Sequence, residues 1–395
     1  MTECRFPFLL LSLWEIVNLS PYPIDFHTVN VYENDDIVLN ALFTDKRVWQ
    51  TNHNRTYGSR MKKLQVKDVL TALDVITGGR LVKGPACYAG KNPFVVTKSS
   101  GIPGKAVTEM PGLVWGDPEM EIRRVGVMMT LTESAIELAG ATGVNCLIAH
   151  HPIAEAANTG GVLARDYLNL YNIAVIELHE AFHGLHPGIA WLHGSKANKV
   201  DIRYGGVPGK IVWFGEAIPE VPTLGVLIDR LSELMGTSLE ERILKAESEM
   251  RGCSDLEEPS VAAKAKIYIG KPEDKLGRSI IVFPHTGFSP DDLERAVKEY
   301  PADTLVCTIS RPLPDAALVD KARELGLNLV AGNSHAMEIL ENGVPLAYAI
   351  ARQLPDLDVR LFRERMVSYP LEYCSNPKLL TYAKGIAEKY LPKPL

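Results

Sequence analysis

The sequence predicts an α/β protein in which two similar halves form an α/β/α layered fold behind an N-terminal extension. Three observations predict this fold class. Apolar runs without polar–apolar alternation recur along the chain, as expected for strands buried on both faces of a sheet. Segments with apolar residues at helical spacing separate these runs. The runs form two successive series of about 150 residues, the usual size of one domain.

The composition is that of a globular protein without a membrane span. Of the 395 residues, 46% are hydrophobic and 23% are charged, near the average for soluble domains. The 42 basic and 48 acidic residues give a net charge of −6, which argues against nucleic acid or an anionic membrane as a partner. No apolar run reaches the roughly 18 residues that a transmembrane helix needs. The six cysteines form no CxxC pair, and Cys146 and Cys307 lie in apolar strand-like runs. We therefore expect these two to be buried thiols in a reducing, cytoplasmic location, with a disulfide framework or a zinc site as the alternatives.

We expect four segments along the chain. Residues 1–60 show no sustained helical or strand period and are expected to be a disordered or accessory extension ahead of Met61. A signal sequence is the alternative there, because Arg5 precedes an apolar run, but no clean small-residue cleavage site follows. Residues 61–204 are expected to form the first α/β half and residues 205–365 the second. Residues 366–395 are expected to form a C-terminal tail and helix.

In the first half, apolar residues at helical spacing predict a helix that starts near Val66 and stops at Gly78–Gly79. A region rich in glycine and proline follows and predicts loops with short strands. Thr130-x-x-Glu133 resembles a capping box, ahead of a helix that ends at Gly143. The remaining elements are expected to be strands at 124–129, 144–149 and 173–178 and a helix at 161–171.

In the second half, turn residues separate strands from helices in the same way. Ser289 is expected to cap a helix that has Pro290 at its first position, and Gly236 is expected to end the helix over residues 223–235. Further helices are expected at 315–325 and 338–354. The expected strands cover residues 210–214, 266–269, 279–283, 304–309 and 327–330.

Histidines follow the ends of four expected strands. His150 and His151 end one strand, and His179, His285 and His335 each follow another. In open α/β sheets, ligands bind at the carboxyl ends of the strands. A single histidine at a strand end is more often a structural hydrogen-bonding group, but four such ends together favour a ligand site. Imidazole with a carboxylate, such as Glu338 three residues beyond His335, suits zinc, iron or manganese.

The adjacent pair His150 and His151 favours a site with two ions. Neighbouring side chains diverge, so the pair can offer one imidazole to each of two metals. Two metals about 3.5–4 Å apart would fit a hydrolytic site. Other histidines have simpler explanations: His186 precedes Pro187 in an expected turn, and His193 is expected to be a packing or surface residue on a short helix. The chain lacks a P-loop, a GxGxxG motif and a GxSxG nucleophile elbow.

The run Val144-Asn-Cys-Leu-Ile-Ala-His150-His151-Pro152-Ile153 resembles the signature of the NGG-interacting-factor-three-like family. These proteins are also called dinuclear-metal-centre hexameric proteins or the GTP cyclohydrolase I type 2 family. The resemblance covers roughly residues 61–365, in matching segment order. It implies an α/β/α fold of two similar halves and a toroidal homohexamer whose metal sites face an internal cavity.

The resemblance also implies roles for individual residues. His150 and His151 match the paired histidines, His335 the late histidine and Glu338 the bridging carboxylate. His179 matches the first residue of the family's His-x-x-x-Asp segment, but His183 stands at its Asp position. This departure removes a negative charge, and the late His and Glu are three residues apart here instead of four.

These features together predict a metal-dependent hydrolase that acts on a small nucleotide-like or phosphorylated substrate. The expected ligands of two divalent ions (zinc, iron or manganese) per chain are His150, His151, His183, His335 and Glu338. His179 or Glu180 is the expected general base. The alternatives are a non-catalytic metal-binding oligomeric scaffold or regulator, and a pocket that binds a small ligand without metal. The expected partners are the small molecule and further copies of the chain, without nucleic acid or membrane.

Overall fold

The computed structural model describes residues 63–82, 92, 94–99, 106–151, 164–179, 181–200, 211–283, 288–308, 312–332, 338–374 and 376–392. The chain divides into two compact units, Met1–Met61 and Lys62–Leu395, and every element below belongs to the second. The expected extension over residues 1–60 lies outside the described residues, as do Glu180, His285 and His335.

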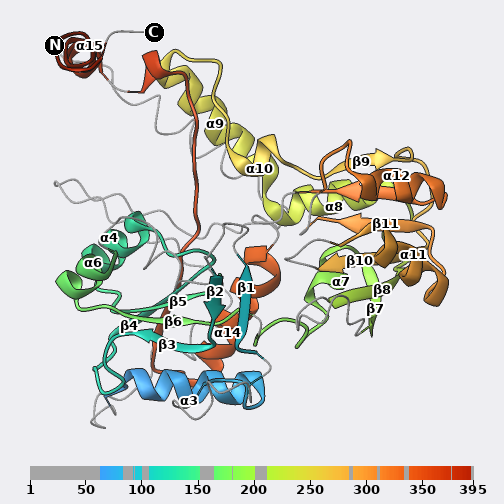
Figure 1. Cartoon of the computed structure of the whole chain (residues 1–395), viewed down its shortest axis with the longest axis horizontal. Helices are drawn as coiled ribbons and strands as arrows, with labels where there is room; N and C mark the ends of the chain where they lie inside the picture. The colour runs from blue at the N-terminus through green and yellow to red at the C-terminus, as the bar shows by residue number, and fades with distance from the viewer. Residues whose placement is uncertain are drawn as a thin grey trace, which may run out of the picture. The chain divides into compact units, whose positions relative to one another are not determined.

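The first sheet has five strands in the order β13-β4-β5-β6-β3. Its strands are β3 (Gly112–Trp115), β4 (Arg124–Met128), β5 (Cys146–Ala149), β6 (Ala174–Glu177) and β13 (Asp358–Leu361). Strands β13, β4, β5 and β6 are parallel, and β3 pairs antiparallel with β6 at one edge (Figure 1). The three strands expected from apolar runs in this half are therefore confirmed, each with slightly shorter bounds.

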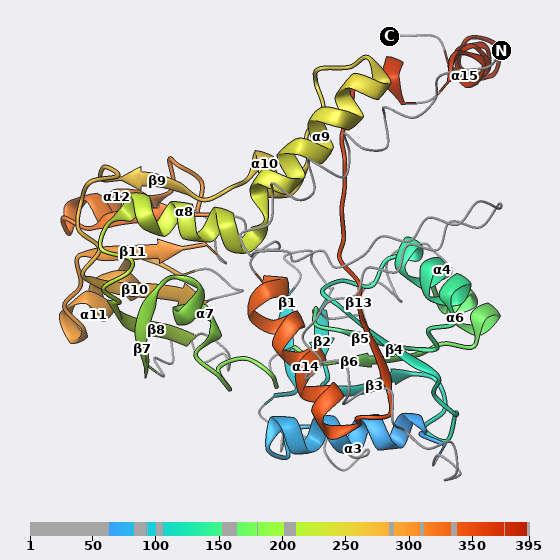
Figure 2. The ribbon, with the colours of Figure 1, turned by 180° about the vertical axis from the view of Figure 1, so that it is seen from behind.

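Helices cover both faces of this sheet. On one face, α3 (Val66–Thr77) and α14 (Val344–Gln353) share a core with strand side chains such as Val125 and Ile148. On the other face, α4 (Glu133–Thr142) and α6 (Ala164–Tyr171) pack against strand residues such as Leu147 (Figure 2). The lack of alternation in the strands is thereby explained, because both faces are buried.

The N-cap of α4 differs from the expected one. The Thr132 hydroxyl, and not that of Thr130, accepts the hydrogen bond from the Ala135 backbone N–H at 3.2 Å. Thr130 instead contacts His151, as described below. The expected end at Gly143 is confirmed, since this glycine adopts the left-handed conformation at φ 72°.

The second sheet has six strands in the order β7-β8-β10-β11-β12-β9. They are β7 (Ser195–Val200), β8 (Ile211–Ala217), β9 (Lys266–Ile269), β10 (Arg278–Phe283), β11 (Thr304–Cys307) and β12 (Asn328–Ala331). Helices α7 (Gly188–Leu192) and α8 (Leu224–Met235) pack on one face, and α11 (Pro290–Glu299) and α12 (Ala317–Glu324) on the other. The predicted α/β class, with two helix-covered sheets, is confirmed.

Several elements have no counterpart among the expected ones. They are strands β7 and β13 and helices α9 (Thr237–Arg251), α10 (Pro259–Ala262) and η3 (Leu371–Tyr373). The short strands expected in the region rich in glycine and proline are present as the hairpin β1 (Val96–Ser99) and β2 (Ala106–Glu109) and as β3, and the expected C-terminal helix is α15 (Pro377–Tyr390). The expected helix over residues 338–354 is present, but it begins as a π-helix, η2 (Ile339–Gly343), before it continues as α14.

Two of the cysteines are free thiols in the protein core. Cys146 and Cys307 are free and buried, as predicted, and burial raises the pKa of each thiol to about 12. Among the described residues, no helix is long and apolar enough to cross a bilayer.

Candidate metal centre

Two neighbouring parallel strands deliver the first histidines to one edge of the five-stranded sheet. Ala149 at the end of β5 pairs with Glu177 at the end of β6, and the Leu178 N–H donates to the Ala149 carbonyl at 3.0 Å. The pairing therefore continues past both strand ends and sets His150 and His179 side by side. This arrangement is the one predicted from their positions after apolar strands.

Three imidazoles come together there, and we call His150, His179 and His183 the histidine cluster. Their ligand atoms all lie within 4.8 Å of one another. Their exposed fractions are 0%, 4% and 3%. His183 belongs to the turn after β6, and Arg80 holds that turn by donating to the Ala181 carbonyl at 3.1 Å.

The hydrogen bonds of two cluster members fix where their ring protons lie. His150 Nδ1 is 2.9 Å from the Leu178 carbonyl, which can only accept, so Nδ1 carries the proton. His179 Nδ1 donates in the same way to Glu109 Oε2 at 2.8 Å, and Glu109 is itself buried. In a neutral imidazole, the opposite nitrogen Nε2 then carries a lone pair, which is the form that binds a metal.

The nitrogen spacing also suits an ion after a small adjustment. His150 Nε2 and His183 Nε2 lie 2.8 Å apart, so His183 donates to the lone pair of His150. Two imidazole nitrogens that share a tetrahedral zinc ion lie about 3.3 Å apart. Outward shifts of a few tenths of an ångström, with loss of the shared proton, would therefore convert this pair into two ligands. The donor set fits a transition metal ion.

His151 and Glu338 lie beside the cluster. Glu338 directs Oε2 to His151 Nε2 at 2.8 Å, and its Oε1 lies 3.8 Å from His150 Nε2. The carboxylate is 3% exposed. Its two oxygens point to the two adjacent histidines, one to each. On the far side of the His151 ring, the Thr130 hydroxyl lies 2.8 Å from Nδ1. The bridging role that the resemblance implies for Glu338 stays a prediction.

Five of the seven residues singled out as ligands or bases are thus gathered in one place, and His335 and Glu180 lie outside the described residues. His186 is elsewhere: its Nδ1 accepts from the Gly188 N–H at 3.1 Å in the turn before α7. His193 is fully buried at the end of α7 and bonds to the Ile189 carbonyl and to Thr308, in agreement with the predicted packing role.

Three further residues support the site and were not found from the sequence. Glu109 orients His179, Thr130 contacts His151, and Asn342 Nδ2 lies 3.2 Å from His150 Nε2. Glu109 ends β2 in a region without a recognisable period, and Asn342 lies in the π-helical turn. Thr130 was singled out in the sequence, but as part of a capping box and not as a contact of His151.

Residues 104–179 match the family model Duf34/NIF3 (NGG1p interacting factor 3). The matched segment includes His150, His151 and His179. The resemblance to the NIF3-like family is confirmed. No curated protein matches the chain.

Solved structures that match the chain include reduced HcgD from Methanocaldococcus jannaschii, at 16% identity and a TM-score of 0.50, covering 76% of this chain and 99% of that protein. A Bacillus cereus protein related to NIF3 has 12% identity and a TM-score of 0.46, covering 78% and 100%. A NIF3 superfamily protein from Sphaerobacter thermophilus has 14% identity and a TM-score of 0.38, covering 76% and 98%. At this identity, the likeness to the first supports the fold alone.

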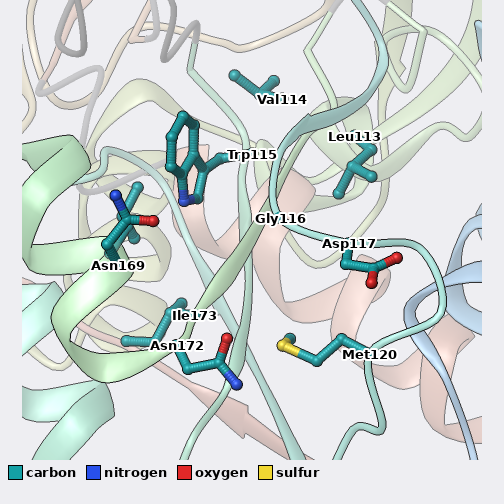
Figure 3. A pocket seen from close by; sticks show the side chains of 10 residues that line it. Leu113, Val114, Trp115, Gly116, Asp117, Met120, Asn169, Asn172 and Ile173 are labelled. Atoms are coloured by element: carbon teal, nitrogen blue, oxygen red, sulfur yellow. The ribbon is translucent and has the colours of Figure 1, made fainter.

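A pocket of about 520 Å³ lies away from the histidines (Figure 3). Trp115, Asn169 and Ile173 are among its lining residues. Asn172 and Ile173 precede β6, whereas His179 follows it, so the pocket and the cluster lie at opposite ends of that strand. The buried histidine cluster, and not this pocket, is the part of the described chain that could bind a metal ion.

Proposed function

We propose that this protein holds a divalent transition metal ion at His150, His179 and His183. One observation carries the proposal: three buried imidazoles converge, and backbone and carboxylate acceptors turn two Nε2 lone pairs toward a common point. Zinc, iron and manganese suit such a set.

We further propose a second ion, shared between His151 and Glu338, with His335 as an additional ligand. Glu338 already contacts His151 and approaches His150, so its carboxylate can bridge two ions. The resemblance to the dinuclear family supports this count, and the replacement of the family's Asp by His183 weakens it by one negative charge. A homohexamer is proposed on the same resemblance.

The activity proposed for this centre is hydrolysis of a small nucleotide-like or phosphorylated molecule. A bound divalent ion would supply Lewis-acid chemistry and lower the pKa of a water molecule. Glu109 would hold the His179 ring in one orientation, and Thr130 would do the same for His151. Glu180, or His179 if it holds no ion, would take up a proton from the water molecule.

His179 has two proposed roles that exclude each other. An Nε2 atom that holds an ion cannot also accept a proton, so His179 is either a ligand or the general base. In the first case, His179→Ala loses metal together with activity. In the second case, the variant keeps its metal and loses only turnover.

The hydrolase proposal is tested by turnover of metal-replete full-length protein on a panel of nucleotides and phosphate esters. We expect metal-dependent release of product by the wild type and by Glu220→Gln, an exposed control, and none by His150→Ala. If the metal-replete wild type turns over no member of the panel while His150→Ala changes only metal content, the hydrolase proposal fails.

A non-catalytic metal-binding scaffold or regulator is the second candidate. The specific observation in its favour is burial: the three cluster members are at most 4% exposed, and no carboxylate is among them. Structural metal sites are closed and fully ligated by protein, whereas catalytic sites keep an open position. Stoichiometric metal without turnover on the same panel would support this candidate.

A further inference from the structure

Helix α9 presents its polar face to the protein. Glu240 is only 3% exposed, and both Arg363 and Arg365 contact its carboxylate, at 3.0 and 3.2 Å. Arg365 also pairs with Glu247 at 3.1 Å. These contacts hold the C-terminal segment that follows β13 against α9 (Figures 1 and 2). The side of α9 that would normally bury apolar residues is therefore occupied by ion pairs.

The apolar side of α9 faces outward instead. Leu239 is 48% exposed, Ile243 39% and Met250 82%, and Ala246 between them is also exposed. The intervals between these four residues are four, three and four, which is the spacing of the seam between two packed helices. We call these four residues the α9 stripe. A surface helix ordinarily points such a stripe into the core, so its exposure indicates a partner.

We propose that the α9 stripe is a contact between two copies of this chain, packed antiparallel about a two-fold axis. Arg242 and Glu249 flank the stripe on one side, and within the described residues neither forms an ion pair. In a parallel pair about a two-fold axis, the two copies of this side would lie on opposite sides of the seam, so Arg242 could not reach the partner's Glu249. In an antiparallel pair, Arg242 lies within one turn of the partner's Glu249, and the two-fold axis repeats this contact.

The chemistry of α9 favours a second copy over other occupants. Its four acidic and three basic residues nearly cancel, so the helix has no surplus of positive charge with which to bind an anionic membrane. The stripe is self-complementary, because Leu239 meets the partner's Met250 and Ile243 meets the partner's Ala246. A seam of about three helical turns is small for a stable interface, so the contact is expected to be reversible at micromolar concentration.

Sizing of the full-length protein by light scattering over a concentration series tests the proposal. Ile243→Asp should weaken the contact at least tenfold and halve the particle mass at concentrations where the wild type is assembled. Ser238→Asp, which adds the same charge to an exposed position of α9 outside the stripe, should leave the mass unchanged. Circular dichroism should show equal helix content in all three proteins. Equal masses for Ile243→Asp and wild type would overturn the proposal.

Disulfide trapping tests the direction of packing and the identity of the occupant. In a background with Cys4, Cys87 and Cys374 changed to serine, an equimolar mixture of Leu239→Cys and Met250→Cys proteins should form an inter-chain disulfide. A disulfide between two Leu239→Cys chains would overturn the antiparallel arrangement. Absence of any inter-chain disulfide, together with an unchanged mass for Ile243→Asp, would mean that another segment, such as residues 1–60, covers the stripe.

Discussion

At the scale of single residues, the chemistry of the centre depends on which ring nitrogen carries a proton. The Leu178 carbonyl and the Glu109 carboxylate settle this for His150 and His179. A histidine whose second nitrogen is held by a carboxylate is a better metal ligand, because the ring is oriented and more basic. Glu109 should therefore change the metal affinity of the centre, although it is not one of the proposed ligands.

We expect Glu109→Gln to weaken metal binding by ten- to a hundredfold, because an amide is a weaker acceptor than a carboxylate and orients the His179 ring less well. Competition with a fluorescent zinc chelator measures the affinity. Glu220→Gln, an exposed substitution of the same kind, should bind as the wild type does. An unchanged affinity in Glu109→Gln would show that His179 does not act as a ligand.

His193 should make stability depend on pH. Burial is the main cause that lowers its folded-state pKa from 6.5 to about 4. The unfolded chain therefore takes up this proton first as the pH falls. Stability is complete above pH 6.5 and decreases down to about pH 4, by about 3 kcal/mol from this group alone. In urea unfolding at several pH values, His193→Gln should show a shallower loss; equal slopes would contradict this assignment.

The residues of the centre differ in how far the sequence reveals them. His150, His151 and His179 follow apolar strands, and parallel strands necessarily deliver their ends to one edge. Glu109 could not be found, because its contact with His179 joins residues 70 positions apart and depends on where the β1–β2 hairpin lies. Thr130 was assigned wrongly because the pattern Thr-x-x-Glu is local, whereas its actual partner His151 comes from the next strand.

At the scale of elements, the choice between two threonines is open to a direct test. Thr132→Ala should reduce the free energy of unfolding by about 1 kcal/mol, because the Ala135 N–H loses its cap. Thr71→Ala, at an exposed position inside α3, should be neutral or slightly stabilising, since alanine is the better helix former. Chemical denaturation measures both. A larger loss in Thr130→Ala than in Thr132→Ala, measured without metal, would contradict the assigned cap.

Helices were predictable where the apolar face that the sequence shows is also the face that the fold buries. The α3, α8 and α11 helices carry an apolar face that is buried, and glycine or serine marks an end of each. Helix α9 was missed although its apolar residues recur at helical spacing, because most of its residues are polar or charged. Strand β13 was missed because four residues of mixed polarity form a strand only through their pairing with β4, more than 200 positions earlier.

At the scale of the whole molecule, the end of the chain completes the sheet and core formed at its start. Leu346 and Ile350 of α14 pack with Val66 and Leu73 of α3. The same helical segment begins with Glu338 and Asn342, which reach the histidines. Neither the order of the strands nor the packing of α14 on the first sheet could be predicted from the sequence. The apolar runs indicate which residues form strands, but not which strands pair.

Leu346→Ala should therefore destabilise the fold by about 2–5 kcal/mol, because a 1% exposed side chain leaves a cavity between α14 and the sheet. Tyr348→Ala, on the exposed side of the same helix at 71%, should cost little. Urea denaturation of the metal-free proteins compares them. Similar small losses in both would show that α14 is not anchored on this core.

The most direct test of the metal centre is the metal content of purified full-length protein. It is measured by elemental mass spectrometry after the protein has been reloaded with metal and free metal has been removed by buffer exchange. We predict two equivalents of a transition metal per chain in the wild type and in Glu220→Gln. His150→Ala, with unchanged circular dichroism, should lose at least one of them, because His150 belongs to the histidine cluster and its Nε2 also lies 3.8 Å from Glu338 Oε1. No bound metal in the wild type, or the same content in His150→Ala, would contradict a metal centre at these histidines.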